Sequence, residues 1–116
     1  MGILKSTNSG KGRYWETILL NKGYYKNPKY PGWIIHPDDR SVDRIPDDVI
    51  VIDENSNLAT VYVIIGNYGR RVQLVDMEHL RLIEEYWSYK KMWTDSIAVN
   101  HAKWLGDEII KYADRH

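Results

Sequence analysis

Hydrophobic residues follow two different periods along this 116-residue chain, and the period changes near residue 76. Before that point, short runs of β-branched and aromatic residues are separated by turn residues, as in antiparallel strands. The runs that predict strands cover residues 14–20, 33–36, 49–52, 58–65 and 70–75. Beyond residue 76, apolar residues recur at spacings of three and four, which indicates helices. We therefore expect an α+β fold, a small antiparallel β-barrel or curled sheet of four to five strands followed by two C-terminal helices.

Two aspartates mark the starts of the predicted helices. Asp76 is a suitable N-cap for the first helix. Asp95 lies in the break between the two helices and is a suitable N-cap for the second. The first helix carries a second apolar stripe that includes Tyr86, Tyr89 and Trp93. This stripe leaves aromatic side chains available to a partner chain, so the pattern permits a homodimer through the first helix.

The domain organisation follows from the same pattern. Residues 1–12 are rich in Gly, Ser, Asn and Lys, without an apolar period, and predict a flexible tail. Residues 13–116 are expected to form a single domain, β-rich over 13–75 and helical over 76–116. The chain has no Cys and no apolar run of the roughly 18 residues that a spanning helix needs, so we expect an intracellular protein that does not enter membranes.

The charges are balanced overall but divided along the chain. Residues 1–31 carry six basic side chains against Glu16, whereas residues 36–57 carry seven carboxylates against two arginines. This division predicts either a surface with one basic and one acidic region, or two segments whose charges neutralise each other across the fold. A net charge of zero argues against a protein held to nucleic acid by bulk electrostatics.

The motifs of common enzymes are missing from the sequence. No Ser lies in a Gly-x-Ser-x-Gly turn, no phosphate-binding Gly-rich loop ends in Lys-Ser/Thr, and no two His are four residues apart. His36 beside Asp38 and Asp39 is the nearest approach to a metal site, and this arrangement is typical of a solvated surface pair. We expect no enzyme activity, no cofactor and no metal.

A metal-dependent nuclease is the third hypothesis for function. Asp47 precedes a predicted hairpin, as the first carboxylate of such sites often does. The following strands carry neither the second carboxylate nor the nearby Lys that a divalent ion and phosphodiester hydrolysis require.

Aromatic residues gather before the second predicted strand. The chain has 9 Tyr and 5 Trp but no Phe, and Tyr24, Tyr25, Tyr30 and Trp33 all lie within ten residues. Aromatic faces of this kind can enclose a quaternary ammonium through cation–π attraction, and the intervening Pro and Gly favour a tight loop. The alternative is that Tyr30 and Trp33 close the open end of a barrel.

The segment Tyr30-Pro31-Gly32-Trp33 resembles the opening signature of PWWP domains of the Tudor-like superfamily, an aromatic, Pro, any residue and an aromatic before a strand. Residues 58–66 are similar to the third strand of that family, and residues 70–82 to the next strand and its Leu-containing turn. The resemblance implies an SH3-like barrel that reads methylated lysine and contacts DNA, in the nucleus.

The resemblance also implies roles for individual residues. Tyr30 and Trp33 would form the aromatic cage, and Ile64 stands where the family has a third wall, so Tyr62 or Tyr68 is the expected substitute. The residues expected to contact phosphate are Lys29, Arg70 and Arg71.

A protein partner is the main expectation, and a second hypothesis uses a different surface. A small phage- or virus-encoded inhibitor in the host cytoplasm could dock its Tyr and Trp residues, with an acidic loop, onto a host enzyme. The acidic residues of that alternative surface are Asp38, Asp39, Asp47 and Asp48.

Overall fold

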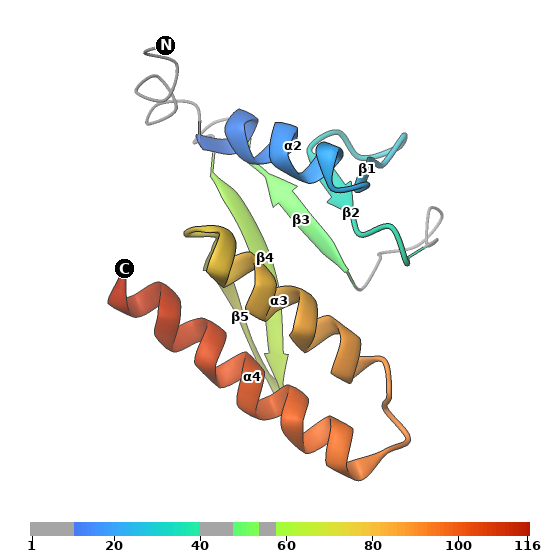
Figure 1. Cartoon of the computed structure of the whole chain (residues 1–116), viewed down its shortest axis with the longest axis vertical. Coiled ribbons are helices and arrows are strands. Elements are labelled where there is room, and N and C mark those ends of the chain that lie inside the picture. Colours follow the sequence, from blue (N-terminus) through green and yellow to red (C-terminus); the bar gives the residue numbers. More distant parts are fainter. Residues whose placement is uncertain (1–10, 40–47, 54–57) are drawn as a thin grey trace. The chain divides into compact units, whose positions relative to one another are not determined.

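The computed structural model describes residues 11–39, 48–53 and 58–116. The elements follow one another as α2 (Lys11–Asn21), β1 (Tyr25–Lys26), β2 (Trp33–Ile35), β3 (Val49–Ile52), β4 (Ala59–Ile65), β5 (Tyr68–Gln73), α3 (Met77–Lys90) and α4 (Ser96–Arg115) (Figure 1). The five strands are hydrogen-bonded in the order β1-β2-β3-β4-β5. Within the described ranges β1 does not pair with β5, so the sheet is open and not a closed barrel. The expected α+β class, an antiparallel sheet followed by two C-terminal helices, is confirmed.

The predicted strand over residues 14–20 is wrong, because this segment belongs to helix α2. Trp15 and Leu19 are four residues apart and are buried at 5% and 0% exposure, whereas Tyr14 and Leu20 are exposed. The local run of aromatic and β-branched residues favours a strand, but burial of one helical stripe against β2 and β3 decides the outcome. The helix begins at Lys11, inside the segment expected to be a tail.

The other predicted strands are present, and the aromatic loop contains the additional two-residue strand β1. In the β2–β3 pair, Ile34 lies opposite Ile50, and both side chains are fully buried. Strands β3 and β4 pair with Val51 opposite Thr60, as the predicted hairpin requires. The loop of this hairpin, residues 54–57, lies outside the described residues, as do residues 40–47 of the acidic linker.

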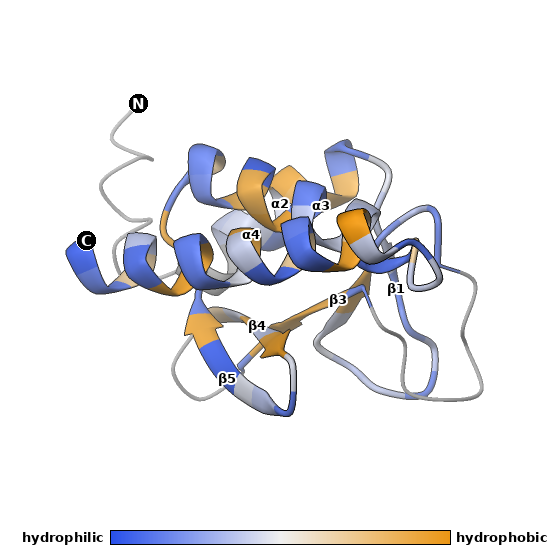
Figure 2. Cartoon of the chain, turned by 90° about the horizontal axis from the view of Figure 1, so that it is seen from below, coloured by the Kyte–Doolittle hydropathy of each residue, from blue (hydrophilic) through white to orange (hydrophobic). Residues whose placement is uncertain are grey.

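Contacts divide the chain into two units, Met1–Val61 and Tyr62–His116, and strand β4 contributes residues to both. In the first unit, α2 packs on β2 and β3. In the second unit, α3 and α4 pack against each other, and Figure 2 shows both on the same side of the β4–β5 hairpin. No helix in the described ranges combines the length and apolar character needed to cross a bilayer.

Both predicted helix starts are confirmed in the second unit. The side chain of Asp76 accepts a hydrogen bond from His79 N, and that of Asp95 accepts from Ile97 N and Ala98 N. Each cap satisfies backbone donors that have no partner inside the helix. The caps therefore fix where the two helices begin.

Gly106 and Tyr86 hold the two helices close to strand β4. A Cβ atom on Gly106 of α4 would lie 3.0 Å from Cγ1 of Ile65, so α4 approaches the strand closely at this glycine. From α3, Tyr86 Oη accepts a hydrogen bond from Ile64 N at 2.8 Å and donates to Ile64 O at 2.9 Å. Tyr86 is 1% exposed. It therefore belongs to the core and is not part of an exposed stripe on the first C-terminal helix.

Candidate binding site

The aromatic loop between β1 and β2 is held by its own hydrogen bonds. Asn27 is 4% exposed, and its Oδ1 accepts from Lys29 N at 2.7 Å and from Tyr30 N at 3.0 Å. The backbone closes the same loop, because Asn27 N donates to Trp33 O and Trp33 N donates to Tyr30 O. These bonds follow directly on the β1–β2 pairing and leave few conformations open to the loop.

Gly32 fits the loop against strand β3. Its φ of +92° lies in the region that L side chains rarely adopt, and a Cβ atom there would lie 2.7 Å from Ile52 O. In turn, Ile52 N donates to Gly32 O at 2.7 Å. The loop is therefore tied to the sheet at a point where only glycine fits without rearrangement.

Tyr30 and Trp33 stack on each other within this loop. Their ring centroids are 4.4 Å apart and their planes are 24° from parallel. Tyr30 is 45% exposed, and Trp33 is half-buried beside it. At this separation no cation fits between the rings, so the stack offers an outer aromatic face instead of a gap between two walls.

Tyr24 and Tyr25 support the loop with side chains that are buried or half-buried. Tyr24 is 4% exposed, and its ring meets the His36 ring edge-on at 5.2 Å. Tyr25 is half-buried, and its hydroxyl donates to the carbonyl oxygen of Asp39. Both side chains brace the base of the loop, whereas Tyr30 reaches its surface.

Tyr62 and Tyr68, the expected substitute walls, lie on the β4–β5 hairpin of the second unit. They are 53% and 52% exposed. The Tyr62 ring covers Gly69, so closely that a Cβ atom on Gly69 would collide with the ring. This packing fixes Tyr62 on the face of its own hairpin.

The described aspartates of the acidic linker differ in exposure. Asp38 has a side chain that is 76% exposed, 3.9 Å from Nδ1 of His36. Asp39 and Asp48 are 8% and 1% exposed, and Asp39 Oδ2 accepts from Asp48 N at 3.2 Å. Asp47 lies outside the described residues. Where the structure describes this linker, Asp38 is the carboxylate that faces solvent, and the described residues contain no cluster of three metal-ligating side chains.

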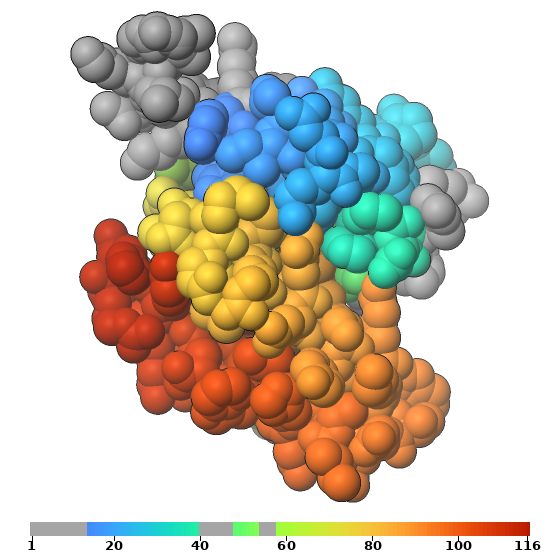
Figure 3. Space-filling view, in the orientation of Figure 1, coloured from blue at the N-terminus to red at the C-terminus, as the bar shows by residue number. Residues whose placement is uncertain are grey.

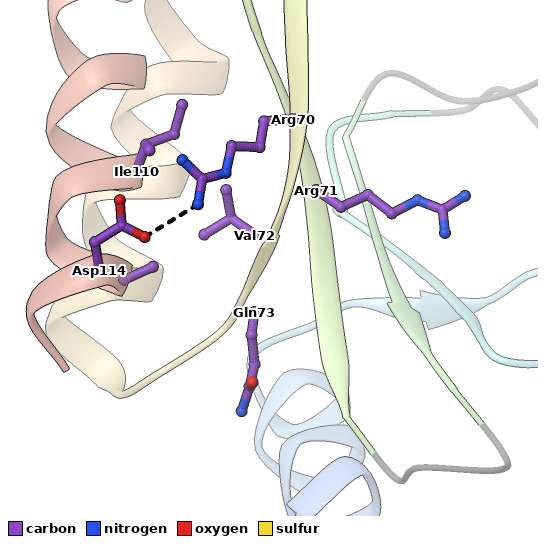
Figure 4. Close-up of a pocket in the computed structure, with 7 residues that line it drawn as sticks. Arg70, Arg71, Val72, Gln73, Ile110 and Asp114 are labelled. Carbon is purple, nitrogen blue, oxygen red and sulfur yellow. Dashed lines mark hydrogen bonds and ion pairs between the residues drawn. The ribbon is translucent and has the colours of Figure 1, made fainter.

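Arg70 and Arg71 point in different directions (Figure 4). Arg70 reaches toward α4, where its Nη2 lies 3.1 Å from Oδ1 of Asp114, whereas Arg71 points away from α4. A pocket of about 190 Å³ lies beside the ion pair, lined by residues of β5 and α4 that include Val72 and Ile110. Both arginines also contribute to the lining of this pocket, but their side chains point in different directions, and Arg70 already has a carboxylate partner.

The chain matches no family model, no curated protein and no solved structure.

A polar column in the second unit was not predicted from the sequence: it runs from the buried His79 through the half-buried Tyr112 to the exposed His116. The rings of His79, Tyr112 and His116 stack in succession, with centroids 4.9 Å and 4.3 Å apart. Tyr112 Oη donates to the Asp76 carboxylate at 2.7 Å. Burial alone would raise the pKa of Asp76, but the hydrogen bonds from His79 N and Tyr112 Oη outweigh it and lower the pKa. The same bond to Asp76 raises the pKa of Tyr112.

This column joins the start of α3 to the end of α4. Asp76 and Tyr112, which are joined by a hydrogen bond in this column, are 36 residues apart in the sequence. No short-range motif therefore predicts the column. The helical spacing of His79 and Tyr112 with their apolar neighbours is the signal that could have placed them on facing sides of two helices.

Proposed function

We propose that the protein is a non-enzymatic binding module that recognises its ligand with the outer face of the Tyr30–Trp33 stack. The observation that carries the proposal is an exposed Tyr30 ring stacked at 4.4 Å on Trp33 in a loop braced by Asn27 and Gly32. A ligand that meets a loop already ordered loses less free energy on binding than one that must order it. Exposed aromatic rings on rigid supports are frequent centres of binding energy.

The proposed ligand is a methylated lysine side chain. Its methylammonium group carries a positive charge that is weakly hydrated, and aromatic faces attract such a group through cation–π interaction. Because Tyr30 and Trp33 touch, the cation would lie on the open face of Tyr30, with Trp33 stacked beneath it. This arrangement differs from a cage of separated walls and predicts moderate affinity for a single ring face.

A weak contact with DNA accompanies this proposal. Lys29 adjoins the stack in sequence, and Arg71 is an exposed side chain that points away from α4. Phosphate contacts made by such residues give binding that weakens as salt is added, whatever the DNA sequence. Arg70 contributes less, since its guanidinium group is paired with Asp114.

The test compares a trimethyl-lysine peptide with the same peptide unmodified, by Trp fluorescence and calorimetry on the full chain. We expect tighter binding of the methylated peptide, retention with Tyr30→Phe, and a loss of about 1 kcal/mol, or about fivefold in affinity, with Tyr30→Leu. Tyr14→Leu is the matched control, because Tyr14 is 42% exposed on α2.

Two outcomes would contradict the proposal. Equal affinity for both peptides would exclude recognition of the methyl groups, and unchanged binding by Tyr30→Leu would exclude the stack. Charge reversal at Asp38 distinguishes the acidic-surface hypothesis, since docking onto a basic partner would be lost and binding at the stack would persist.

A further inference from the structure

Strand β5 has one open edge in the part of the chain that the structure describes. It is the last strand in the order β1-β2-β3-β4-β5, and within that part it pairs only with β4. The backbone N–H and C=O groups along the other edge of a terminal strand are available to a further strand. A chain that adds to such an edge is bound by main-chain hydrogen bonds, and its alternate side chains enter pockets. The natural occupant of this edge is therefore an extended segment.

The pocket between β5 and α4 lies along this open edge. Four consecutive residues of β5, from Arg70 to Gln73, contribute to its lining. Successive side chains of a strand point to opposite faces of the sheet, as those of Arg70 and Arg71 do (Figure 4). A pocket lined by all four residues therefore extends around an edge of the strand. Because β4 pairs with one edge, the pocket lies at the other.

The wall of the pocket is apolar on the side of α4. Val72 and Ile110 are 4% and 7% exposed, and the half-buried Ala113 of α4 lies in the same wall. The last turns of α4, coloured red in the space-filling view, lie at the surface (Figure 3). The pocket volume of about 190 Å³ is smaller than the roughly 300 Å³ at which sites for drug-sized molecules begin. A space of this size and polarity suits one apolar side chain.

The charges around the pocket leave one arginine unpaired. Arg70 and Asp114 form an ion pair, so together they contribute little net charge. Arg71 is exposed on the opposite face of the sheet, and no described residue forms an ion pair with it. Gln73 is also exposed and follows Arg71 by two residues, which places it on the same face. An acidic side chain is therefore the complement of this face of the strand.

We propose that the open edge of β5 binds an extended acidic segment of a protein partner as an added strand. One residue of the segment places an apolar side chain, such as that of valine, in the pocket over Val72 and Ile110. Its two neighbours point to the opposite face, where an acidic side chain meets Arg71 and a polar or acidic one meets Gln73. The expected pattern is acidic, apolar, then polar or acidic. All residues of this site lie in the second unit, so the proposal does not depend on the Tyr30–Trp33 stack.

A second copy of this chain fits the open edge of β5 poorly. Antiparallel pairing of two β5 strands centred on the arginines sets Arg70 of one copy opposite Arg71 of the other. Parallel pairing in register sets each arginine opposite the same residue of the other copy. Like charges directly opposite each other destabilise a pair of strands. The arginines therefore protect the edge from pairing with itself and favour a partner of opposite charge.

The first test titrates the full chain with the heptapeptide Thr-Thr-Glu-Val-Glu-Thr-Thr, blocked at both ends, by calorimetry. We expect the same peptide with Lys in place of Glu to bind at least about fivefold more weakly, and Arg71→Glu to reverse this preference. Tyr30→Leu should bind the acidic peptide as the unaltered chain does. Loss of binding by Tyr30→Leu would place the peptide at the stack and would overturn the proposal.

The second test fills the pocket. Ala113→Leu adds a side chain to the apolar wall and should weaken binding of the acidic peptide about tenfold, because the valine side chain no longer enters. Asn100→Leu is the matched control, since it adds the same side chain at an exposed position of α4 outside the pocket. Far-UV circular dichroism confirms that both variants retain the helices.

The third test separates strand addition from simple charge attraction. Every second N–H group of an added strand faces the strand to which it pairs. N-methylation at one alternate set of peptide residues should therefore abolish binding, and N-methylation at the other set should be tolerated. Hydrogen exchange of the β5 amides that face the open edge should slow when the unmethylated peptide is bound.

Four results would overturn the proposal. These are equal affinity for the acidic and basic peptides, binding by Arg71→Glu with an unchanged preference, N-methylation that has the same effect at every position, and no detectable binding of the acidic peptide. A dimer in sedimentation velocity whose β5 amides are already protected from exchange would also overturn it, because a second copy would then occupy the edge.

Discussion

His79 Nε2 lies 3.0 Å from the carbonyl oxygen of Ile109, so a buried imidazole ties α3 to α4. The other ring nitrogen, Nδ1, accepts a hydrogen bond from Val75 N at 3.1 Å. Because Nδ1 accepts, the ring proton is on Nε2 and is donated to Ile109. The neutral ring satisfies one backbone donor and one backbone acceptor inside the second unit. His79 is fully buried, and burial lowers its pKa.

Stability should fall as the pH is lowered below the ordinary histidine pKa of about 6.5. The unfolded chain binds a proton on His79 below that pH, whereas the folded chain, with its lowered pKa, does not. The unfolded state therefore binds more protons, and the free energy of unfolding decreases by up to about 1.4 kcal/mol per pH unit until the folded pKa is passed. Asp76, whose pKa is also lowered, adds a further loss below about pH 4.

Urea unfolding at several pH values measures this effect. His79→Gln should have a lower free energy of unfolding at pH 7.5 and a flatter dependence between pH 6.5 and 5, since its amide does not titrate. Asn100→Gln is the control, because it exchanges one exposed amide of α4 for another that does not titrate and should keep the pH profile of the unaltered chain. Equal slopes for His79→Gln and the unaltered chain would show that His79 is not the group responsible.

Tyr86→Phe should destabilise the fold by about 1–3 kcal/mol, because it leaves Ile64 N and Ile64 O without the hydroxyl that satisfies both. The ring itself is retained, so packing changes little. Tyr68→Phe removes a hydroxyl from a residue that is 52% exposed and should change stability by less than about 0.5 kcal/mol. The midpoints of chemical denaturation measure the difference, and equal midpoints would contradict the role given to the Tyr86 hydroxyl.

Gly32→Ala should cost about 2–4 kcal/mol in folding free energy. The added methyl group would meet Ile52 O at 2.7 Å, and the backbone would keep a φ that alanine disfavours. Gly66→Ala provides the comparison, since Gly66 also has a positive φ but no atom within 4 Å of the added Cβ. That variant should lose about 1 kcal/mol from backbone strain alone. Thermal unfolding of the two variants separates collision from strain, and equal losses would contradict the close approach at Gly32.

Asn27→Ala should lower stability by about 1–3 kcal/mol and weaken ligand binding at the Tyr30–Trp33 stack. The change removes the acceptor that holds Lys29 N and Tyr30 N, so the loop loses its fixed conformation. Asn100→Ala removes an exposed amide from α4 and should leave both properties unchanged. Binding by Asn27→Ala at full strength would indicate that the ligand, and not the loop, supplies the order.

The sequence was informative where one face of an element is buried and the period is clear. Strands β3 and β4 and helices α3 and α4 were predicted, because β-branched runs and capped helical stripes are local signals. Helix α2 was missed, because the residues around Thr17 and Ile18 favour a strand locally, and only packing on β2 and β3 selects the helix. Local propensity and tertiary burial disagree in that segment.

The candidate site was predictable as a set of aromatic residues but not as an arrangement. Their closeness in sequence placed Tyr30 and Trp33 in one loop, whereas stacking depends on the turn that Asn27 holds. Burial of Asp39 and Asp48 also could not be predicted, because aspartates are usually exposed and their environment is set by neighbours distant in sequence. The polar column of His79 likewise depends on contacts between two helices.

The shared strand β4 limits how the protein can be divided for experiments. The boundary between Val61 and Tyr62 cuts through β4, which runs from Ala59 to Ile65. A fragment that ends there would keep the part of β4 that pairs with β3 but lose the residues that follow, and the complementary fragment would begin inside a strand. Paired fragments should therefore overlap across the whole of β4, so that each carries a complete strand. Ligand mapping by truncation requires such overlapping fragments.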